Sequence, residues 1–199
     1  MKQFKAIAAM SLNRVIGNGN KIPWHLPEDF KWFRQMTTGN ITVMGRKTFE
    51  SLPGLLPNRP KLVLTRHPQS LIRRHPEIFG QFKEWRGGKH PTMHLQRPYQ
   101  MHFTRVDGRS GGDLWLFNSL ELVKPEEFAV DVFICGGAQI YEQALPLCSD
   151  LYLTLVKREV EGDAFFPPFE NQFEPVEKIR ETPEFDILRY RRRGTFNTQ

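Results

Sequence analysis

The chain has 199 residues, a length that suits one domain over residues 1–199, and it is 39% hydrophobic and 25% charged. This composition excludes a disordered chain and a collagen-like repeat. The longest apolar run, residues 6–10, is too short to cross a bilayer, and the sequence shows no signal peptide. Because it has only two cysteines, we expect a cytoplasmic protein that does not bind membranes.

The net charge of +6 is concentrated in one stretch of the chain. Residues 66–113 hold nine Lys or Arg against four Asp or Glu, whereas the rest is nearly neutral. A basic stretch raises the hypothesis of a nucleic-acid partner, but this one lacks the interleaved aromatic and basic residues of a recognised binding module. We therefore expect no nucleic-acid partner.

Strand-like and helix-like segments alternate along most of the chain. In order, the sequence predicts a strand over residues 4–9, a helix over 28–37, a strand over 41–44, a helix that begins near 46, and strands over 61–65 and 131–135. A helix through 144, a strand over 151–156 and two antiparallel strands within 173–193 complete the series. This alternation predicts an α/β fold with parallel strands.

Residues 67–112 depart from this alternation. Tyr99, Met101 and Phe103 alternate with polar residues, which is typical of one half-buried strand. The glycines of residues 107–112 favour turns that bring this strand back against residues 114–117. We therefore expect a hairpin here, since a structureless loop of this length is unusual inside a compact domain.

Five of the histidines also lie in this stretch, and they raise the hypothesis of a metal site. They are His67, His75, His90, His94 and His102. No cysteine or carboxylate cluster joins them at a spacing that metals favour. We therefore predict solvated histidines and no metal site.

Asp29 lies on the apolar side of the first predicted helix, because Phe33 and Met36 follow it at helical spacing. Burying a carboxylate there costs free energy unless a cation or a hydrogen-bond donor meets it. Two interpretations stay open. The carboxylate is either a first-turn residue stabilised by the helix dipole, or a buried acid that recognises a polar, protonatable ligand between phenyl rings.

Two glycine-containing segments each follow a predicted strand and open a helix: Gly45-Arg46-Lys47-Thr48 and Gly136-Gly137-Ala138-Gln139. Free backbone N–H groups at such positions suit phosphate. Thr65 and Arg66 add a hydroxyl and a cation at another strand end. Each segment alone also fits a structural turn, but together, in an α/β chain, they favour a nucleotide.

Residues 22–33, Ile-Pro-Trp-His-Leu-Pro-Glu-Asp-Phe-Lys-Trp-Phe, resemble a segment of dihydrofolate reductases. The resemblance continues in the family's order over about three quarters of the chain, through residues 6–9, 13–17, 43–51, 56–59, 62–66, 134–141, 151–154 and 161–167. It implies the family's three-layer α/β fold, with a mostly parallel central sheet, an antiparallel C-terminal strand and helices on both faces.

The resemblance implies reduction of 7,8-dihydrofolate to tetrahydrofolate, with hydride from NADPH going to C6 and a proton going to N5. The family's acid matches Asp29, which would hold the pterin and accept a hydrogen bond from Thr154, while Trp24 would belong to a mobile lid. Substrate contacts would come from Ile7, Phe30, Phe33, Leu52 and Leu56, and Arg59 would bind the α-carboxylate of the glutamate, whose tail could be polyglutamylated.

The resemblance also implies a set of NADPH contacts, with a cis peptide between the paired glycines. The nicotinamide would contact Ala9, Ile16, Gly17, Asn18, Gly19, Asn20, Lys21 and Ile22. The phosphates would contact Gly45, Arg46, Lys47 and Thr48, and the adenosine 2′-phosphate would contact Thr65 and Arg66. The pyrophosphate and the ribose would contact Cys135, Gly136, Gly137, Ala138, Gln139, Ile140 and Tyr141.

The sequence departs from the family pattern in two places. Residues 67–112 are longer and more basic than the resemblance implies, so they could steer polyanions, form a solvated elaboration or self-associate. Some relatives carry a further basic residue where this chain has Pro-Gly-Leu at residues 53–55. Binding of a glutamate tail would therefore depend on Arg59 and Arg34. We otherwise expect a monomer.

Two alternative functions remain. A pyrimidine reductase of riboflavin synthesis would share the fold, the glycines and the NADPH site, but residues 23–33 with Asp29 argue against it. A nucleotide-binding protein without catalysis would bind NADPH and would not oxidise it when dihydrofolate is added.

Overall fold

The computed structural model describes residues 2–84, 100–105 and 112–194. The helices are α1 (Pro27–Thr37), α2 (Arg46–Glu50), α3 (Pro68–Arg74), α4 (Pro76–Phe79) and α5 (Ala138–Ala144), with 3-10 turns η1 (Leu120–Leu122), η2 (Pro125–Glu127) and η3 (Leu145–Leu147). The strands are β1 (Phe4–Ser11), β2 (Val15–Gly17), β3 (Ile41–Gly45), β4 (Lys61–Leu64), β5 (Phe82–Glu84), β6 (Gln100–Arg105), β7 (Leu114–Phe117), β8 (Val132–Ile134), β9 (Cys148–Val156), β10 (Ala164–Phe165), β11 (Phe173–Glu181) and β12 (Phe185–Arg192). No described helix is long and apolar enough to cross a membrane.

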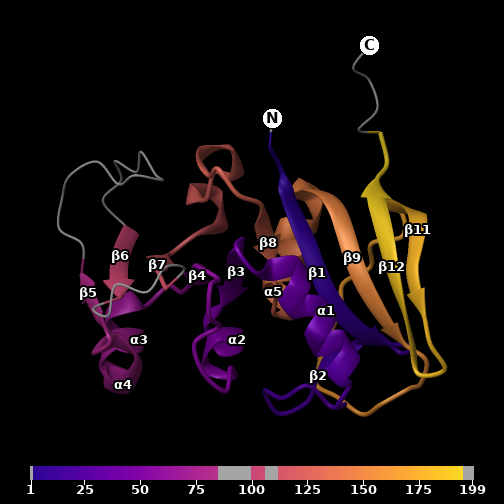
Figure 1. Ribbon diagram of the computed structural model, residues 1–199, viewed down its shortest axis with the longest axis horizontal. Coiled ribbons are helices and arrows are strands. Elements are labelled where there is room, and N and C mark those ends of the chain that lie inside the picture. The colour runs from indigo at the N-terminus through magenta and orange to yellow at the C-terminus, as the bar shows by residue number, and fades with distance from the viewer. Residues whose placement is uncertain (1, 85–99, 106–111, 195–199) are drawn as a thin grey trace.

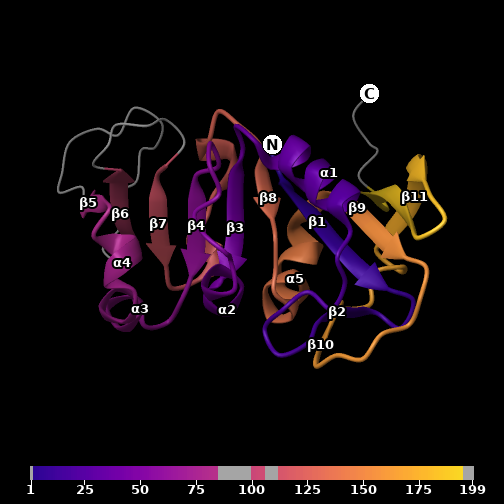
Figure 2. The ribbon, with the colours of Figure 1, turned by 60° about the horizontal axis from the view of Figure 1, so that its bottom comes forward.

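Within the described residues, ten strands form one sheet in the order β11-β12-β9-β1-β8-β3-β4-β7-β6-β5 (Figure 1). The pairs from β9 across to β7 are all parallel. β4 and β7 are buried at every position, as expected where a parallel sheet is covered on both faces. α1 covers one face and α5 the other (Figures 1 and 2). The predicted α/β fold is therefore confirmed.

Both edges of the sheet are antiparallel. At one edge β12 pairs with β9 and β11 pairs with β12, as the sequence predicted for residues 173–193. β9 begins at Cys148, three residues before the predicted start, because its pairing with β1 extends to Phe4. β2 and β10 form a separate small antiparallel sheet.

At the other edge the sheet continues into the basic stretch. The predicted hairpin is confirmed, because β6 pairs antiparallel with β7, with Met101 opposite Leu116. The proposed turn within residues 107–112 and the strand position Tyr99 lie outside the described residues, apart from Gly112. The expectations of a half-buried strand and of solvated histidines are both wrong at His102, which is buried with its ring stacked 4.9 Å from Trp115.

The sequence did not predict α3, α4 or β5, which complete this edge. They are held by a second apolar cluster in which Leu71, Phe79 and Phe82 pack with Phe103 and with residues of β4 and β7. The rings of Phe79 and Phe103 meet edge to face at 5.3 Å. The described part of the basic stretch therefore packs against the sheet.

Candidate active site

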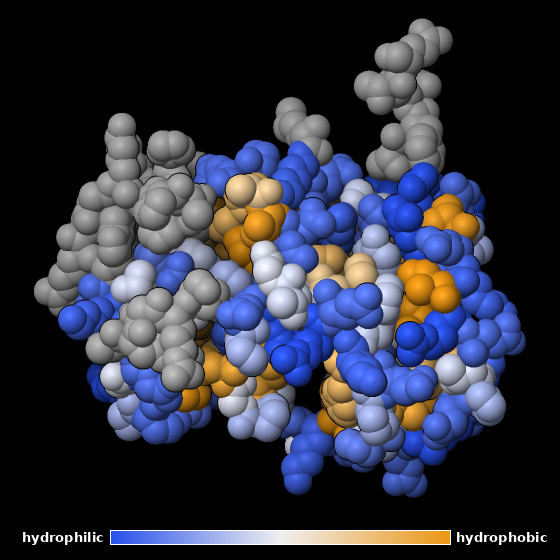
Figure 3. Space-filling model, in the orientation of Figure 1, coloured by the Kyte–Doolittle hydropathy of each residue, from blue (hydrophilic) through white to orange (hydrophobic). Residues whose placement is uncertain are grey.

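A hollow opens in the surface between the part built from α2 and the part built from α1 and β2, and apolar side chains show on its wall (Figure 3). The strands β3 and β8 are parallel neighbours, so their carboxyl ends meet at one edge of the sheet, where α2 and α5 begin. Ligands of open α/β sheets bind outside this edge. The predicted cofactor contacts at residues 45–48 and 135–141 lie on these elements or in the turn between β8 and α5.

Asp29 lies in the first turn of α1 and is 8% exposed. The Thr154 hydroxyl, on β9, donates a hydrogen bond of 2.7 Å to its carboxylate. Thr154 lies opposite Ala9 of β1, so this bond ties the helix to the centre of the sheet. Asp29 therefore has the first-turn position that one interpretation expected and the burial that the other expected.

Burial raises the pKa of Asp29, and the hydrogen bond from Thr154 opposes part of this increase. Among the described residues, no cation offsets the charge of this carboxylate. A buried anion without a counter-ion is costly, which is typical of a group kept for a ligand.

Arg59 is a second buried charge near α1, and it is 5% exposed. Its guanidinium lies 5.9 Å from the ring centroid of Phe33, which is one helical turn beyond Asp29. Burial and the neighbouring Arg34 lower the pKa of Arg59. In the described parts of the chain no carboxylate pairs with Arg59. α1 therefore carries the buried acid in its first turn and, one turn later, Phe33 against the buried cation.

The two glycine-containing segments meet at the end of the sheet. The Gly45 N–H donates to the Gly136 carbonyl at 2.7 Å, and the peptide between Gly136 and Gly137 is cis, as the resemblance implied. A Cβ on Gly137 would lie 3.2 Å from the Thr48 hydroxyl oxygen, a tight contact from which Thr48 would have to move. The buried Tyr141 hydroxyl donates to the Ile7 carbonyl at 2.7 Å and connects the junction to β1.

The predicted phosphate contacts surround this junction. Arg46 is half-buried and its guanidinium bonds Glu50 at 2.6 Å, whereas Lys47 and Arg66 are exposed. Thr65 is buried at the end of β4, where its hydroxyl accepts from the His67 N–H at 3.2 Å. Cations and glycines on one rim fit a dinucleotide with several phosphates.

The remaining predicted site residues lie on β1, α1 and α5, in the segments that follow α2 and β8, and on β2 and the loop after it. Ile7 and Trp24 are buried, and Phe30 is 41% exposed. Half-buried positions are Ala9, Ile16, Gly17, Leu52, Leu56, Cys135, Ala138 and Ile140, and exposed positions are Asn18, Gly19, Asn20, Lys21, Ile22 and Gln139. Trp24 packs with Leu26, Val156 and Phe185, so this ring is anchored in an apolar cluster.

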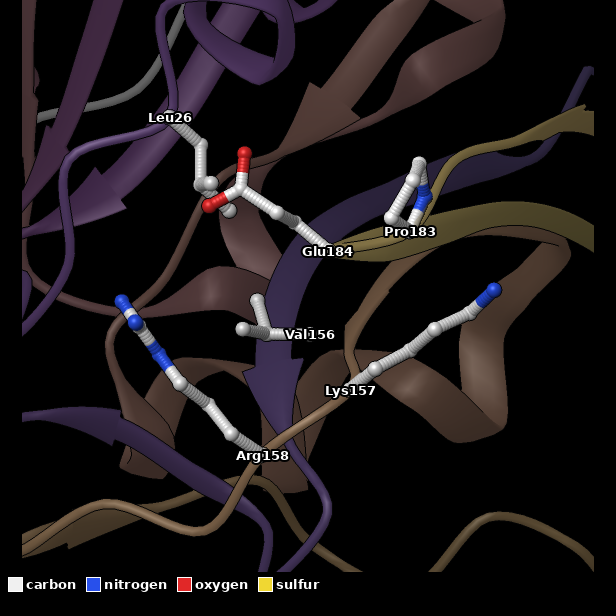
Figure 4. Close-up of a pocket in the computed structure, with 6 residues that line it drawn as sticks. All are labelled: Leu26, Val156, Lys157, Arg158, Pro183 and Glu184. Atoms are coloured by element: carbon white, nitrogen blue, oxygen red, sulfur yellow. The ribbon is translucent and has the colours of Figure 1, made fainter.

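Two pockets lie near that loop. One of about 690 Å³ is lined by Asn18, Lys21, Ile22, Pro23, Trp24, His25 and Arg158, so it brings Trp24 together with three of the predicted nicotinamide contacts. A smaller one of about 190 Å³ lies by Leu26 and Val156 at the end of β9, with Lys157 and Arg158 pointing to opposite sides (Figure 4). No residue of the predicted site lines the smaller pocket.

Two charged groups beside the site, Lys61 and Glu50, were not predicted from the sequence. Lys61 is 1% exposed, and its position as the first residue of a buried apolar strand was the available signal. Glu50 accepts hydrogen bonds or ion pairs from Arg46, Arg74 and His75. It thereby joins α2 to the start of the basic stretch. In the described part of the chain, no three metal-ligating side chains cluster.

Comparison with known proteins agrees with this geometry. A sequence model described as dihydrofolate reductase matches residues 3–86 and 104–192, and it passes over part of the basic stretch. The dihydrofolate reductase of Haemophilus influenzae is 31% identical over 188 residues, covering 92% of this chain and 93% of its own length. That of Neisseria meningitidis is 38% identical over 168 residues, covering 84% and 80%.

A solved structure adds a three-dimensional match. Dihydrofolate reductase from Enterococcus faecalis, complexed with NADP(H) and RAB-propyl, superposes with a TM-score of 0.68 at 27% sequence identity. The match covers 96% of both chains. Sequence and structure therefore agree, and the chain belongs to the dihydrofolate reductase family.

Proposed function

We propose that the protein reduces 7,8-dihydrofolate to tetrahydrofolate with NADPH, and that Asp29 is the acid that holds the substrate. The observation that carries this proposal is the buried Asp29 carboxylate, which has a hydrogen-bond donor in Thr154 and no cation to neutralise it. A pterin presents an amino group and a ring N–H side by side. Both can donate to the two carboxylate oxygens.

The charge of Asp29 favours protonation of the bound pterin at N5. Because the site is apolar, this charge acts through a low dielectric and stabilises a developing positive charge more than it would in water. Water supplies the proton, since the carboxylate holds the opposite edge of the ring. The negative charge of Asp29 thus makes C6 a better acceptor of hydride.

Arg59 binds the other end of the substrate in this proposal. Its guanidinium carries five donors in a planar fork that matches a carboxylate. The α-carboxylate of the glutamate would neutralise a cation that is buried and lacks an anionic partner among the described residues. Phe33, between Asp29 and Arg59 on this side of the site, would pack on the benzoyl group.

NADPH fits the opposite wall of the hollow. Gly136 and Gly137 carry no side chain that would keep the pyrophosphate away from the main chain after β8, and the Thr48 hydroxyl lies beside Gly137. Arg66 is exposed at the end of β4 and would pair with the adenosine 2′-phosphate. When bound, NADPH supplies the hydride. Because NADH lacks the 2′-phosphate, Arg66 favours NADPH.

The experiment that tests this proposal follows the loss of NADPH absorbance when dihydrofolate is added to the purified protein. We expect turnover with NADPH, slower turnover with NADH at equal concentration, and none with the pyrimidine intermediate of riboflavin synthesis. NADPH binding without oxidation would contradict the proposal and favour a nucleotide-binding protein. Turnover of the pyrimidine alone would favour the other reductase.

A further inference from the structure

Lys61 is a charged side chain inside the sheet. It begins β4, pairs in parallel register with Thr42 of β3, and is 1% exposed. Its ammonium donates to the carbonyl of Leu56 at 2.8 Å and to the carbonyl of Arg59 at 2.6 Å. A buried ammonium is costly unless hydrogen bonds satisfy it, and here main-chain carbonyls do so.

These two carbonyls belong to a turn, residues 56–60, in which each main-chain carbonyl accepts a hydrogen bond. The Pro60 carbonyl accepts from Thr42, and the Asn58 carbonyl accepts from the Gly39 N–H at 2.8 Å. The Arg59 side chain itself donates from Nε to the Pro57 carbonyl at 3.2 Å. The turn is thus wrapped round the Lys61 ammonium, which joins its first residue to Arg59.

We propose that Lys61 is a positioning residue for substrate binding: its buried ammonium holds the turn that aims the Arg59 guanidinium at the glutamate carboxylate of the substrate. This inference rests on the proposed function, because it needs Arg59 to bind that carboxylate. Lys61 itself touches no substrate in this arrangement. It acts by fixing the main chain from which Arg59 extends towards Phe33.

The geometry explains why a lysine serves this position better than an apolar residue. An apolar side chain of equal length would fill the space and leave the carbonyls of Leu56 and Arg59 without this donor. Unsatisfied buried carbonyls turn towards other partners, and the turn would then relax. The Arg59 guanidinium must form two parallel hydrogen bonds to the substrate carboxylate. It therefore binds that carboxylate more weakly when the main chain of Arg59 shifts.

The test compares two substrates in steady-state kinetics. Dihydrofolate carries the glutamate, whereas dihydropteroate has the same pterin and benzoate without it. For Lys61→Met we expect KM for dihydrofolate to rise about tenfold, with kcat and the KM values for NADPH and dihydropteroate within about twofold of the parent. Lys61→Gln keeps N–H donors on a shorter side chain, so it should show the same selectivity with a smaller rise.

Two further variants separate the possible failures. Lys157→Met is the matched control, because the Lys157 ammonium also donates to a main-chain carbonyl, that of Thr182 at 2.7 Å, but on the far edge of the sheet. Lys157→Met should leave KM unchanged for both dihydrofolate and dihydropteroate. Arg59→Lys should weaken binding of dihydrofolate and leave dihydropteroate unaffected.

The outcomes are distinguishable. If Arg59→Lys shows no selectivity for dihydrofolate, the proposed role of Arg59 is wrong and the role of Lys61 falls with it. A second outcome is that Arg59→Lys raises KM for dihydrofolate alone, but the Lys61 variants raise KM for dihydrofolate and dihydropteroate equally. Lys61 then only stabilises the fold, and the inference is overturned. Failure of both Lys61 variants to fold would overturn it as well, since the inference predicts folded proteins with altered selectivity.

Discussion

The candidate site has an acid end, Asp29, and a cation end, Arg59, and the two side chains are held in place by different means. Asp29 is held by Thr154, a residue 125 positions further along the chain, so its geometry depends on the packing of α1 against the sheet. Arg59 extends from a turn that is fixed by its own neighbour Lys61. The two ends can therefore be perturbed separately. Changes at the acid end should alter the chemical step as well as the hold on the pterin, whereas changes at the cation end should alter substrate affinity alone.

The largest expected effect comes from Asp29→Asn, which removes the charge and keeps the shape. We expect the rate of NADPH oxidation with dihydrofolate to fall about 100-fold near neutral pH, which is the usual scale for losing a group that governs a proton transfer. The rate should recover partly in acid, where the substrate in solution is already protonated. A pH–rate profile of parent and variant measures this; equal rates at neutral pH would remove Asp29 from the mechanism.

Arg59→Met tests the other end and should act on affinity. Losing a charge-assisted pair of hydrogen bonds should raise KM for dihydrofolate about 30-fold, while kcat changes by no more than about threefold. Initial rates at varied substrate concentration separate these constants. A fall in kcat as large as the rise in KM would show that the two ends are not independent.

Thr154→Val should have a smaller effect at the acid end, since it removes one hydrogen bond and keeps the side-chain volume. We expect kcat/KM to fall about tenfold. Because the bond from Thr154 lowers the pKa of Asp29, its loss should raise that pKa further and move the acidic limb of the pH–rate profile to higher pH. Thr154→Ser restores the donor and should restore the profile.

The smallest expected effect concerns stability. The pKa of Asp29 is raised in the folded protein. At pH values between the ordinary pKa and this raised pKa, the folded protein keeps a proton on Asp29 that the unfolded chain has lost. Stability therefore falls as pH rises through this window, and the ionised carboxylate remains a cost above it. Asp29→Asn without ligands should melt roughly 3 °C higher at neutral pH, a shift that corresponds to about 1 kcal/mol in a chain of this size. In a series of melting curves, the gain should vanish at low pH.

The sequence predicted the acid end well and the cation end only in part. Asp29 could be found because its apolar neighbours recur at helical spacing, and Thr154 followed from the resemblance. Lys61 was missed because a lysine at a strand start is usually solvated, and its burial depends on the turn that folds over it. α3, α4 and β5 were missed because elements of three to seven residues carry too little periodicity. Their burial depends on packing against β4 and β7.

The central claim is that Asp29 is a buried carboxylate whose charge no cation in the described structure offsets. The most direct test is an NMR titration of the Asp29 carboxyl carbon in the protein without ligands, assigned by its loss in Asp29→Asn. We expect a pKa above the ordinary value of 3.8, because burial outweighs the hydrogen bond from Thr154. A midpoint at or below 3.8 would contradict it.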